Sequence, residues 1–325
     1  MNKKRAVEII DRFPNSAVMV VGDIMLDHFI WGKVSRISPE APVPVVDVSE
    51  DRLLLGGSAN VSNNVLAAEG RVFMSGVIGA DDMGRRIIKE FRDRKADTAG
   101  IIVESKRPTT LKTRILAHGQ QVVRFDREVR QSIALDSIEM ILAYFKEIQN
   151  QIGAVVISDY RKGVVTETLL DGIREVVAGR NITVCVDPKQ SDFSIYQGFD
   201  IITPNHLEAG LAAGIEIQNG WDIVRAGTAL LERFDFKGLL ITRGEQGMSL
   251  FERDGGICHT HLPTQAKEVY DVTGAGDTAI GIFALAVASG ATFREAAVLA
   301  NHAAGIAVGK VGTATVSRRE LKRAL

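Results

Sequence analysis

Cysteine is nearly absent from this sequence, which excludes two kinds of framework. The 325 residues contain only Cys185 and Cys258. Two cysteines cannot build a disulfide framework or a cysteine-rich zinc site, so we expect reduced thiols and a cytoplasmic location. Only His259 and His261 among the 6 histidines are closely spaced, and no third ligand follows them. The sequence therefore predicts no zinc site.

An excess of one charge and long apolar runs are also missing. Lys and Arg number 39 and Asp and Glu number 40, giving a formal net charge of −1. This balance removes the electrostatic basis for non-specific nucleic-acid binding. The most apolar stretch, residues 279–288, is well short of the roughly 18 residues that a membrane span needs, and no signal-peptide pattern opens the chain. We expect binding to neither nucleic acid nor a membrane.

What remains is an ordinary globular composition, with 46% hydrophobic and 24% charged residues. Short, continuous Val/Ile-rich runs, typical of strands covered on both faces, alternate with amphipathic helical patterns. This alternation predicts an α/β fold with a doubly wound, mainly parallel sheet. No repeat or long linker divides the chain, so we expect one domain over residues 1–325. The predicted strands are 17–21, 71–78, 154–158, 182–187, 200–203 and 238–242, and the predicted helices are 57–69, 83–95, 135–151, 166–179, 219–234, 275–290 and 293–308.

Two segments do not fit a parallel sheet. Residues 43–49 alternate beside two prolines and form at most an edge strand. Residues 110–117 and 120–126 flank His118-Gly119, which predicts a β-hairpin. We place these pieces, near residues 30–49 and 108–127, in a small β-lid beside the main sheet.

The sharpest motif is DVTGAGDT at residues 271–278, which leads into an Ala-rich helical stretch. Gly274 and Gly276 allow the backbone to approach a ligand, and the first N–H groups of the helix form an anion site. Asp277 in that first turn could take a proton from a hydroxyl, which suits phosphoryl transfer to an alcohol. The alternatives are a helix whose Asp277 only balances the dipole, or a dinucleotide fingerprint ending at Ala279. The fingerprint is disfavoured because it should follow the first strand.

Further candidate ligand groups lie near the first strand. Gly56 and Gly57 precede a helix, and Asn60 could bond sugar hydroxyls; the alternative is a tight turn. Asp23 and Asp27 follow the strand, at the edge where open α/β sheets bind ligands. Their alternative is a strand-ending turn and a surface carboxylate.

Two later segments suit a nucleotide and its metal. Asn205 and Glu208 lie one helical turn apart, where Glu208 could hold a water of Mg²⁺; the alternative is a capping box. Residues 242–247, TRGEQG, follow a buried strand and could position phosphates through the backbone and Arg243. The alternative is an ordinary glycine turn.

Basic residues gather on the predicted hairpin. They are Lys112, Arg114, Arg124 and Arg127, with Arg107 just before. They could bind a phosphate group of the substrate, or they could be charges on an exposed edge strand that prevent aggregation.

Taken together, these motifs resemble the ribokinase-like carbohydrate kinase family over essentially the whole chain. Residues 56–60 resemble its sugar-binding signature, 271–277 its catalytic signature and 205–208 its Mg²⁺/phosphate motif. Further segments resemble one branch, the bacterial D-glycero-β-D-manno-heptose 7-phosphate kinases. These are GDIMLD at 22–27, VSRISPEAPVPV at 34–45 and SDYRKG at 158–163.

The resemblance implies a three-layer fold with a β-lid that forms a homodimer interface. It implies transfer of the ATP γ-phosphoryl group to the anomeric hydroxyl, with Mg²⁺, to give heptose 1,7-bisphosphate for ADP-heptose and lipopolysaccharide synthesis. The implied roles are Asp277 as base; Gly274, Ala275 and Gly276 as anion hole; Asn205 and Glu208 for Mg²⁺ and phosphate; Thr242, Arg243, Gly244, Gly247 and Asn301 along the nucleotide; Asp23, Gly57 and Asn60 at the sugar; and Asp271, with the loop around Gly312, at a monovalent cation such as K⁺.

Two alternatives stay open. One is a related kinase for another sugar phosphate, such as fructose 1-phosphate. The other is a sugar-binding regulator without catalysis, which the intact Asp277 motif disfavours. A dehydrogenase is a third and weaker alternative.

Overall fold

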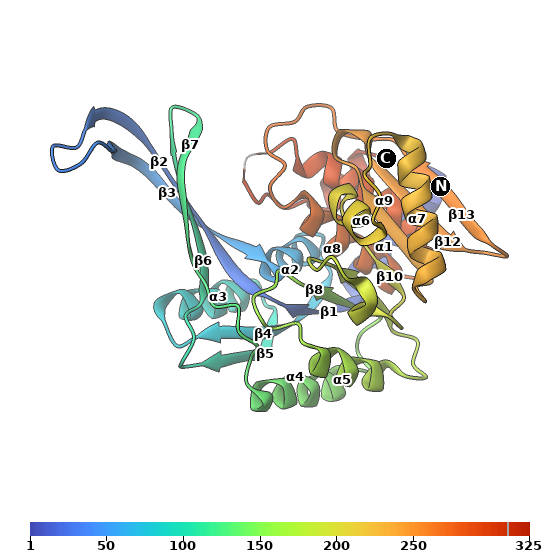
Figure 1. Cartoon of the computed structure of the whole chain (residues 1–325). Coiled ribbons are helices and arrows are strands. Elements are labelled where there is room, and N and C mark those ends of the chain that lie inside the picture. The colour runs from blue at the N-terminus through green and yellow to red at the C-terminus, as the bar shows by residue number, and fades with distance from the viewer. Residues whose placement is uncertain (311) are drawn as a thin grey trace.

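The computed structural model describes residues 1–310 and 312–325. Its main feature is a nine-stranded sheet (Figure 1). In sheet order the strands are β13 (Ile257–Leu262), β12 (Met248–Arg253), β11 (Gly238–Thr242), β10 (Ile201–Ile202), β9 (Thr183–Asp187), β8 (Ala154–Ser158), β1 (Ala17–Gly22), β4 (Arg71–Gly79) and β5 (Asp97–Glu104). Neighbours from β11 to β5 are parallel, whereas β12 is antiparallel to both β11 and β13. The predicted α/β class with a mainly parallel sheet is confirmed.

Helices cover both faces of this sheet, which makes three layers. The two faces of β1 show why: Val18 and Val20 belong to one buried cluster, and Met19 and Val21 belong to the other. Every residue of β1 is buried, as a continuous apolar strand requires. The first cluster includes side chains of α1 (Lys3–Arg12), α2 (Ser58–Ala67), α3 (Asp82–Asp93), α8 (Ala275–Ala288), α9 (Phe293–Ala307) and α10 (Arg318–Arg323); the second includes those of α4 (Leu135–Ile148), α5 (Glu167–Val177), α6 (His206–Ala213) and α7 (Gly220–Arg233).

Helix α8 lies at the centre of its layer. Its residues from Asp277 to Ala286 are all buried, because its Ala and Gly residues let neighbouring helices approach closely. A Cβ at Gly281 would lie 3.0 Å from the carbonyl oxygen of Val61 in α2. This packing holds the first turn of α8 at a fixed place beside α2.

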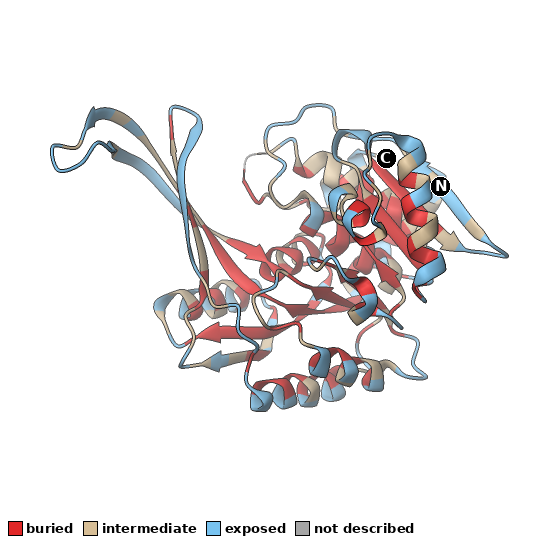
Figure 2. Cartoon of the chain, in the orientation of Figure 1, coloured by how far each residue is buried: buried red, intermediate tan, exposed pale blue. Residues whose placement is uncertain are grey.

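A second, four-stranded sheet projects from the core (Figure 1). Its order is β3 (Pro44–Gly57), β2 (Ile24–Ile37), β6 (Thr110–Ala117) and β7 (Gln120–Arg127). We call it the lid. Figure 2 shows that its outer half is largely exposed, whereas its base joins the buried core.

The predicted hairpin is confirmed, with β6 and β7 joined through His118 (φ 52°) and Gly119 (φ 78°). Positive φ at both positions is what a two-residue type I′ turn needs. Of the edge strand expected at 43–49, residues 44–49 belong to β3, which is an edge of the lid. Strands β2 and β3 extend beyond the lid segment expected near residues 30–49, because buried apolar residues continue from Ile24 to Leu26 and at Leu55.

Several elements differ from the sequence prediction. Helices α1 and α10, strand β5 and the antiparallel pair β12–β13 lie outside the predicted strand and helix ranges, and the strand expected at 200–203 has only Ile201 and Ile202. Strand β5 is an edge strand with a mixed burial pattern, so it carries no clear alternation. Helix α1 buries Ala6, Ile9 and Ile10 at helical spacing, so its sequence did hold a periodic signal, though over only 10 residues. No helix within residues 1–310 and 312–325 is long and apolar enough to cross a membrane.

Candidate active site

The carboxylate of Asp277 lies in the first turn of α8, held on both sides. Its Oδ2 accepts a hydrogen bond from Asn60 Nδ2 at 2.8 Å, and its Oδ1 accepts one from the Tyr160 hydroxyl at 2.6 Å. The turn begins at Gly274 (φ 77°), where a Cβ would lie 2.6 Å from Asn60 Nδ2. A side chain at position 274 would therefore push Asn60 away from Asp277.

Burial raises the pKa of Asp277 to about 6, against the opposing effect of the hydrogen bonds from Tyr160 and Asn60. The side chain is only 5% exposed. Asp27 nearby also raises this pKa, and Lys112 lowers it. A carboxylate with this pKa is mostly ionised at neutral pH and can accept a proton there.

Asn60 belongs to a polar contact between α2 and α8. Asn64, one turn later in α2, donates to the Asn60 carbonyl at 3.0 Å, and its Oδ1 accepts from the Thr278 hydroxyl at 3.0 Å. Asn60 has no exposed surface. The structure thus places Asn60 against Asp277. The sequence predicted Asn60 as a ligand of sugar hydroxyls and did not indicate this contact.

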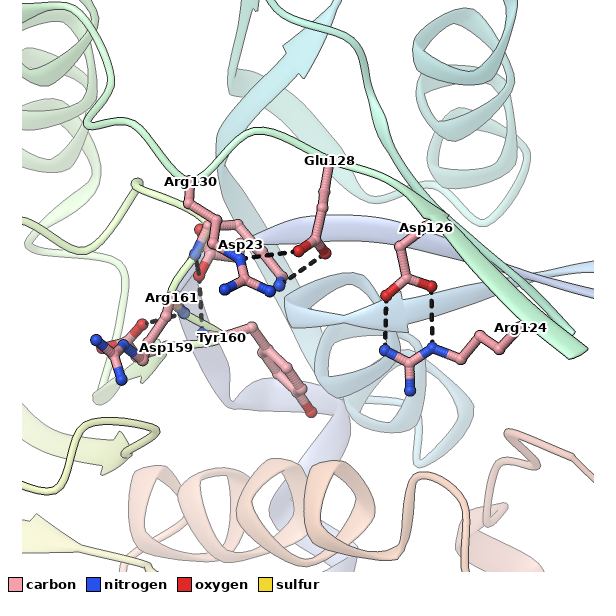
Figure 3. Close-up of polar contacts among 9 residues, drawn as sticks. Asp23, Arg124, Asp126, Glu128, Arg130, Asp159, Tyr160 and Arg161 are labelled. Atoms are coloured by element: carbon pink, nitrogen blue, oxygen red, sulfur yellow. Dashed lines mark hydrogen bonds and ion pairs between the residues drawn. The ribbon is translucent and has the colours of Figure 1, made fainter.

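Asp23 is committed to the backbone of the loop that carries Tyr160 (Figure 3). Its Oδ2 accepts from the N–H groups of Tyr160 and Lys162 at 2.8 and 3.0 Å, and its Oδ1 accepts from Val164 at 3.1 Å. Burial raises its pKa to about 6, although these three N–H groups act in the opposite direction. At 1% exposure, Asp23 is buried and holds this loop through three of its acceptor positions.

Asp27 sits where the lid joins the core. Its Oδ1 forms an ion pair with Arg114 Nη1 at 2.5 Å. A Cβ at Gly56 would lie 2.2 Å from Asp27 Oδ2. Gly56 therefore makes room for this carboxylate. Gly57 (φ 54°) ends β3 in a conformation that favours glycine.

The lid cations differ in their partners. Arg124 is bound by Asp126 through two hydrogen bonds of 2.9 and 2.6 Å (Figure 3). Lys112 instead lies over the ring of Tyr160, 5.4 Å from its centroid. Burial lowers the pKa of Lys112, which Asp27 partly opposes.

Two further cations near the lid are also paired. Arg107, expected with the lid cluster, lies 3.8 Å from Glu104 and donates to the Gln131 carbonyl at 2.5 Å. Lys162 pairs with Glu128 at 2.7 Å.

A cavity of about 660 Å³ opens beside the first turn of α8, where Ala275 and Gly276 line it, and α9 forms one of its walls. Of the residues expected along a nucleotide, Thr242, Gly244, Gly247 and Asn301 line it. Arg243 does not join them. Its side chain contacts Ser249 and His261 at 3.3 and 3.1 Å and lines a separate small cavity.

A smaller cavity of about 130 Å³ adjoins the first and shares Asn205, Thr242 and Gly276 with it. Glu208 also lines it, pairs with Lys189 at 2.6 Å and accepts the Asn205 N–H at 3.0 Å. The capping box between Asn205 and Glu208 is confirmed. Ala275 donates its N–H to the Val272 carbonyl at 3.3 Å, so this group of the expected anion hole is engaged.

Asp271 connects the segment before α8 with the loop at Gly312. Its carboxylate accepts the N–H of Thr273 at 2.9 Å and of Gly312 at 3.0 Å. These hydrogen bonds keep its pKa below the ordinary value against the effect of burial. Residue 311, in the loop expected near a monovalent cation, lies outside the described residues.

Sequence reasoning missed three residues as site residues. Tyr160 bonds Asp277, and Asp187 and Lys189 line the smaller cavity with Glu208. Burial, with Asp277 and Glu208 nearby, raises the pKa of Asp187 well above its ordinary value. Asp187 is the last residue of β9, and Tyr160 and Lys189 follow the carboxyl ends of β8 and β9; that position was the available signal.

Comparisons with known proteins agree with this architecture. A family model described as pfkB family carbohydrate kinase matches residues 15–320. The bifunctional protein HldE of Geobacter metallireducens is 46% identical over 321 residues, covering 99% of this chain and 65% of that protein. The HldE of Geobacter sulfurreducens is 47% identical over 303 residues, covering 93% and 61%. The chain thus spans less than two thirds of the length of these relatives.

Solved structures share the fold. Arabidopsis thaliana ribokinase complexed with ribose and ATP superposes with a TM-score of 0.76 at 19% identity, covering 95% of this chain and 98% of that one. Escherichia coli phosphofructokinase-2 in complex with potassium gives 0.77 at 18% identity, covering 95% and 97%. At such identities the likeness establishes a ribokinase-like fold.

Proposed function

The chain belongs to the pfkB family of carbohydrate kinases, and on this premise we propose that it phosphorylates the anomeric hydroxyl of D-glycero-β-D-manno-heptose 7-phosphate with ATP. The product is the 1,7-bisphosphate, for ADP-heptose and lipopolysaccharide core synthesis. The observation that carries the proposal is the buried Asp277 carboxylate, with a pKa of about 6, one residue from the Gly276 that lines both cavities. The heptose is supported by the segments at 22–27, 34–45 and 158–163 and by the HldE relatives.

The proposed reaction uses Asp277 as general base. The anomeric oxygen bonds to the γ-phosphorus while the bond from that phosphorus to the bridging oxygen breaks, and ADP leaves with the electron pair. The hydroxyl proton goes to Asp277. The N-terminus of α8, with the Gly276 N–H, would stabilise the negative charge on the transferred group, because the first N–H groups of a helix and the helix dipole favour an anion. The Ala275 N–H is less available, since it already bonds the Val272 carbonyl.

The two cavities suit a nucleotide and its phosphates. The larger has Gly244 and Gly247, where a backbone can approach a ligand, and the apolar residues Val269 and Val272. ATP is therefore proposed to lie along Thr242, Gly244, Gly247 and Asn301, with its phosphates toward Gly276. Arg243 is left out of this set because its side chain points into another cavity.

The smaller cavity fits Mg²⁺, since Asn205 and Glu208 offer hard oxygen donors. In the described part of the chain no three His, Cys, Asp or Glu side chains are grouped to hold a metal ion, which suits an ion held largely by water and phosphate. Glu208 would hold it through water, and it would neutralise phosphate charge. A monovalent cation such as K⁺ is proposed beside Asp271 and Gly312, whose contact brings those segments together.

The sugar phosphate is proposed to lie under the lid, between Asp27 and the lid cations. Asp27 is proposed for the sugar hydroxyls because it lies where the lid joins the core, with its Oδ1 paired to Arg114. Asp23 already accepts three backbone N–H groups. Lys112 is the best candidate for the distant phosphate, because Arg114 and Arg124 each pair with a carboxylate.

We propose one kinase domain over residues 1–325, a cytoplasmic location and a homodimer formed through the lid. Apolar side chains exposed on the lid support the dimer, because apolar surface of this kind favours burial against a partner. They are Ile37, Val48, Val122, Val123 and Phe125.

A coupled ADP-release assay tests the function. The purified chain with Mg-ATP is offered heptose 7-phosphate, unphosphorylated heptose and fructose 1-phosphate, with Asp277→Asn as the inactive control. We expect release of ADP only from the wild type and fastest with heptose 7-phosphate. Faster turnover of fructose 1-phosphate would overturn the substrate. Binding of a sugar without any ADP release would instead identify a regulator.

A further inference from the structure

Tyr160 is fixed in place by the core. It lies two residues after the end of β8, in the loop whose N–H groups bond to Asp23, and its own N–H donates to Asp23 Oδ2 at 2.8 Å. Asp23 is 1% exposed at the end of β1. The loop therefore has little freedom, and the direction of the Tyr160 ring is set by the sheet (Figure 3).

The hydroxyl of Tyr160 reaches Asp277, 117 residues away in sequence, at 2.6 Å from Oδ1. Asn60 occupies the other oxygen, Oδ2, at 2.8 Å. One bond to each oxygen fixes the plane of the carboxylate. Two of its lone-pair directions are used by the protein, which leaves the others for a reacting hydroxyl.

We propose that Tyr160 is a positioning residue that orients the Asp277 carboxylate and keeps it ionised for proton acceptance. This rests on the proposed kinase function, in which Asp277 is the base. It assigns to Tyr160 an effect on turnover and on the pH at which the base becomes active, with no contact of its own to the reacting atoms.

The charges around the pair favour this role. The groups that face Asp277 are Tyr160, Asn60, Asp27 and Lys112. Asp187, at the end of β9, is also close enough for the charge of Asp277 to raise its pKa. Burial and these carboxylates raise the pKa of Tyr160 well above its ordinary value. The phenol therefore stays protonated and remains a donor throughout the range in which Asp277 titrates. Donation to the ionised carboxylate lowers its pKa against the effect of burial.

Tyr160→Phe tests the proposal, because it removes the hydroxyl and keeps the ring beneath Lys112. We expect the acid limb of the profile of kcat against pH to move to higher pH by about 1 unit. A shift of this size corresponds to the loss of one charge-assisted hydrogen bond to the carboxylate. We also expect kcat on the plateau to fall about tenfold, with KM for ATP unchanged. A matched control is Tyr144→Phe, which removes a hydroxyl from a buried residue of α4 that packs against Gly100.

A second variant guards against misfolding. Replacing Tyr160 with 3-fluorotyrosine keeps the shape and strengthens the donor, so the acid limb should move to lower pH. A profile unchanged in both variants would overturn the proposal. Asp277→Asn separates the two hypotheses: if it stays active, the proposed base is wrong, whereas if it is inactive and the Tyr160 variants behave like the wild type, only the role of Tyr160 fails.

Discussion

The ammonium group of Lys112 lies 5.4 Å from the centroid of the Tyr160 ring, so a lid residue covers a residue of the core. Tyr160 in turn bonds Asp277. One aromatic ring therefore lies between the lid cation and the proposed base. A cation–π contact of this kind is worth about 0.5–2 kcal/mol. It holds the ammonium group near the site but does not neutralise its charge, as a carboxylate would.

Lys112→Ala should weaken the use of a phosphorylated sugar. A charge-assisted contact is worth about 1.5–3 kcal/mol, so kcat/KM for heptose 7-phosphate should fall about tenfold to a hundredfold, with KM for ATP nearly unchanged. Arg124→Ala is the control, since Asp126 already holds Arg124. Kinetics on heptose 7-phosphate and unphosphorylated heptose test this; equal losses on both sugars would exclude a phosphate contact.

Asp277→Asn should remove the base while keeping the shape of the side chain. We expect kcat to fall by about 10²–10⁴. Binding of Mg-ATP should change little, because Asn60 and Gly276 remain in place. Steady-state kinetics measure kcat, and calorimetric titration with Mg-ATP in the absence of sugar measures the binding. Turnover close to the wild type would show that another group accepts the proton.

The pH dependence of kcat/KM follows from the raised pKa of Asp277. With a pKa of about 6, the carboxylate is ionised at neutral pH and becomes protonated as the pH falls through that value. Protonation removes the base, so log kcat/KM should fall with unit slope below the limb. A rate that stays constant down to about pH 5 would contradict this assignment. Circular dichroism over the same range separates loss of activity from unfolding.

Asp23→Ala should act on stability, because it leaves the N–H groups of Tyr160, Lys162 and Val164 without their acceptor. Each buried N–H left unpaired costs about 1–3 kcal/mol, so we expect a loss of about 2–4 kcal/mol in unfolding free energy after relaxation. Urea denaturation measures it. Asp171→Ala is the control, since this exposed ion pair with Arg174 is worth about 0–1 kcal/mol. Equal stability of the two variants would contradict the structural role.

Phe125→Asp should separate the proposed dimer. Phe125 is 55% exposed on the lid, and burying a carboxylate there in a partner interface would be unfavourable. Size-exclusion chromatography with light scattering should show a dimer for the wild type and a monomer for this variant. Met140→Asp on α4, which is 47% exposed, should stay dimeric. A wild-type monomer would refute the dimer.

The sequence alone determined the local features of this protein. Continuous apolar runs predicted β1, β4, β8, β9 and β11, since a strand buried on both faces needs no polar alternation. The His118-Gly119 turn predicted the lid hairpin, because turn type and strand pairing are set by neighbouring residues. The motif at residues 271–278 likewise indicated a helix start with Asp277 in its first turn.

Only the tertiary structure decided which partners these groups meet. Asn60 and Asp277 are 217 residues apart, and Asp23 bonds a loop more than 130 residues later. Periodicity shows which side of an element is buried, but it does not show which element packs against it. The packing of α2 on α8 gave Asn60, a predicted sugar ligand, Asp277 as a partner that the sequence did not indicate. The neighbouring ends of β1 and β8 brought Asp23 to the loop that carries Tyr160.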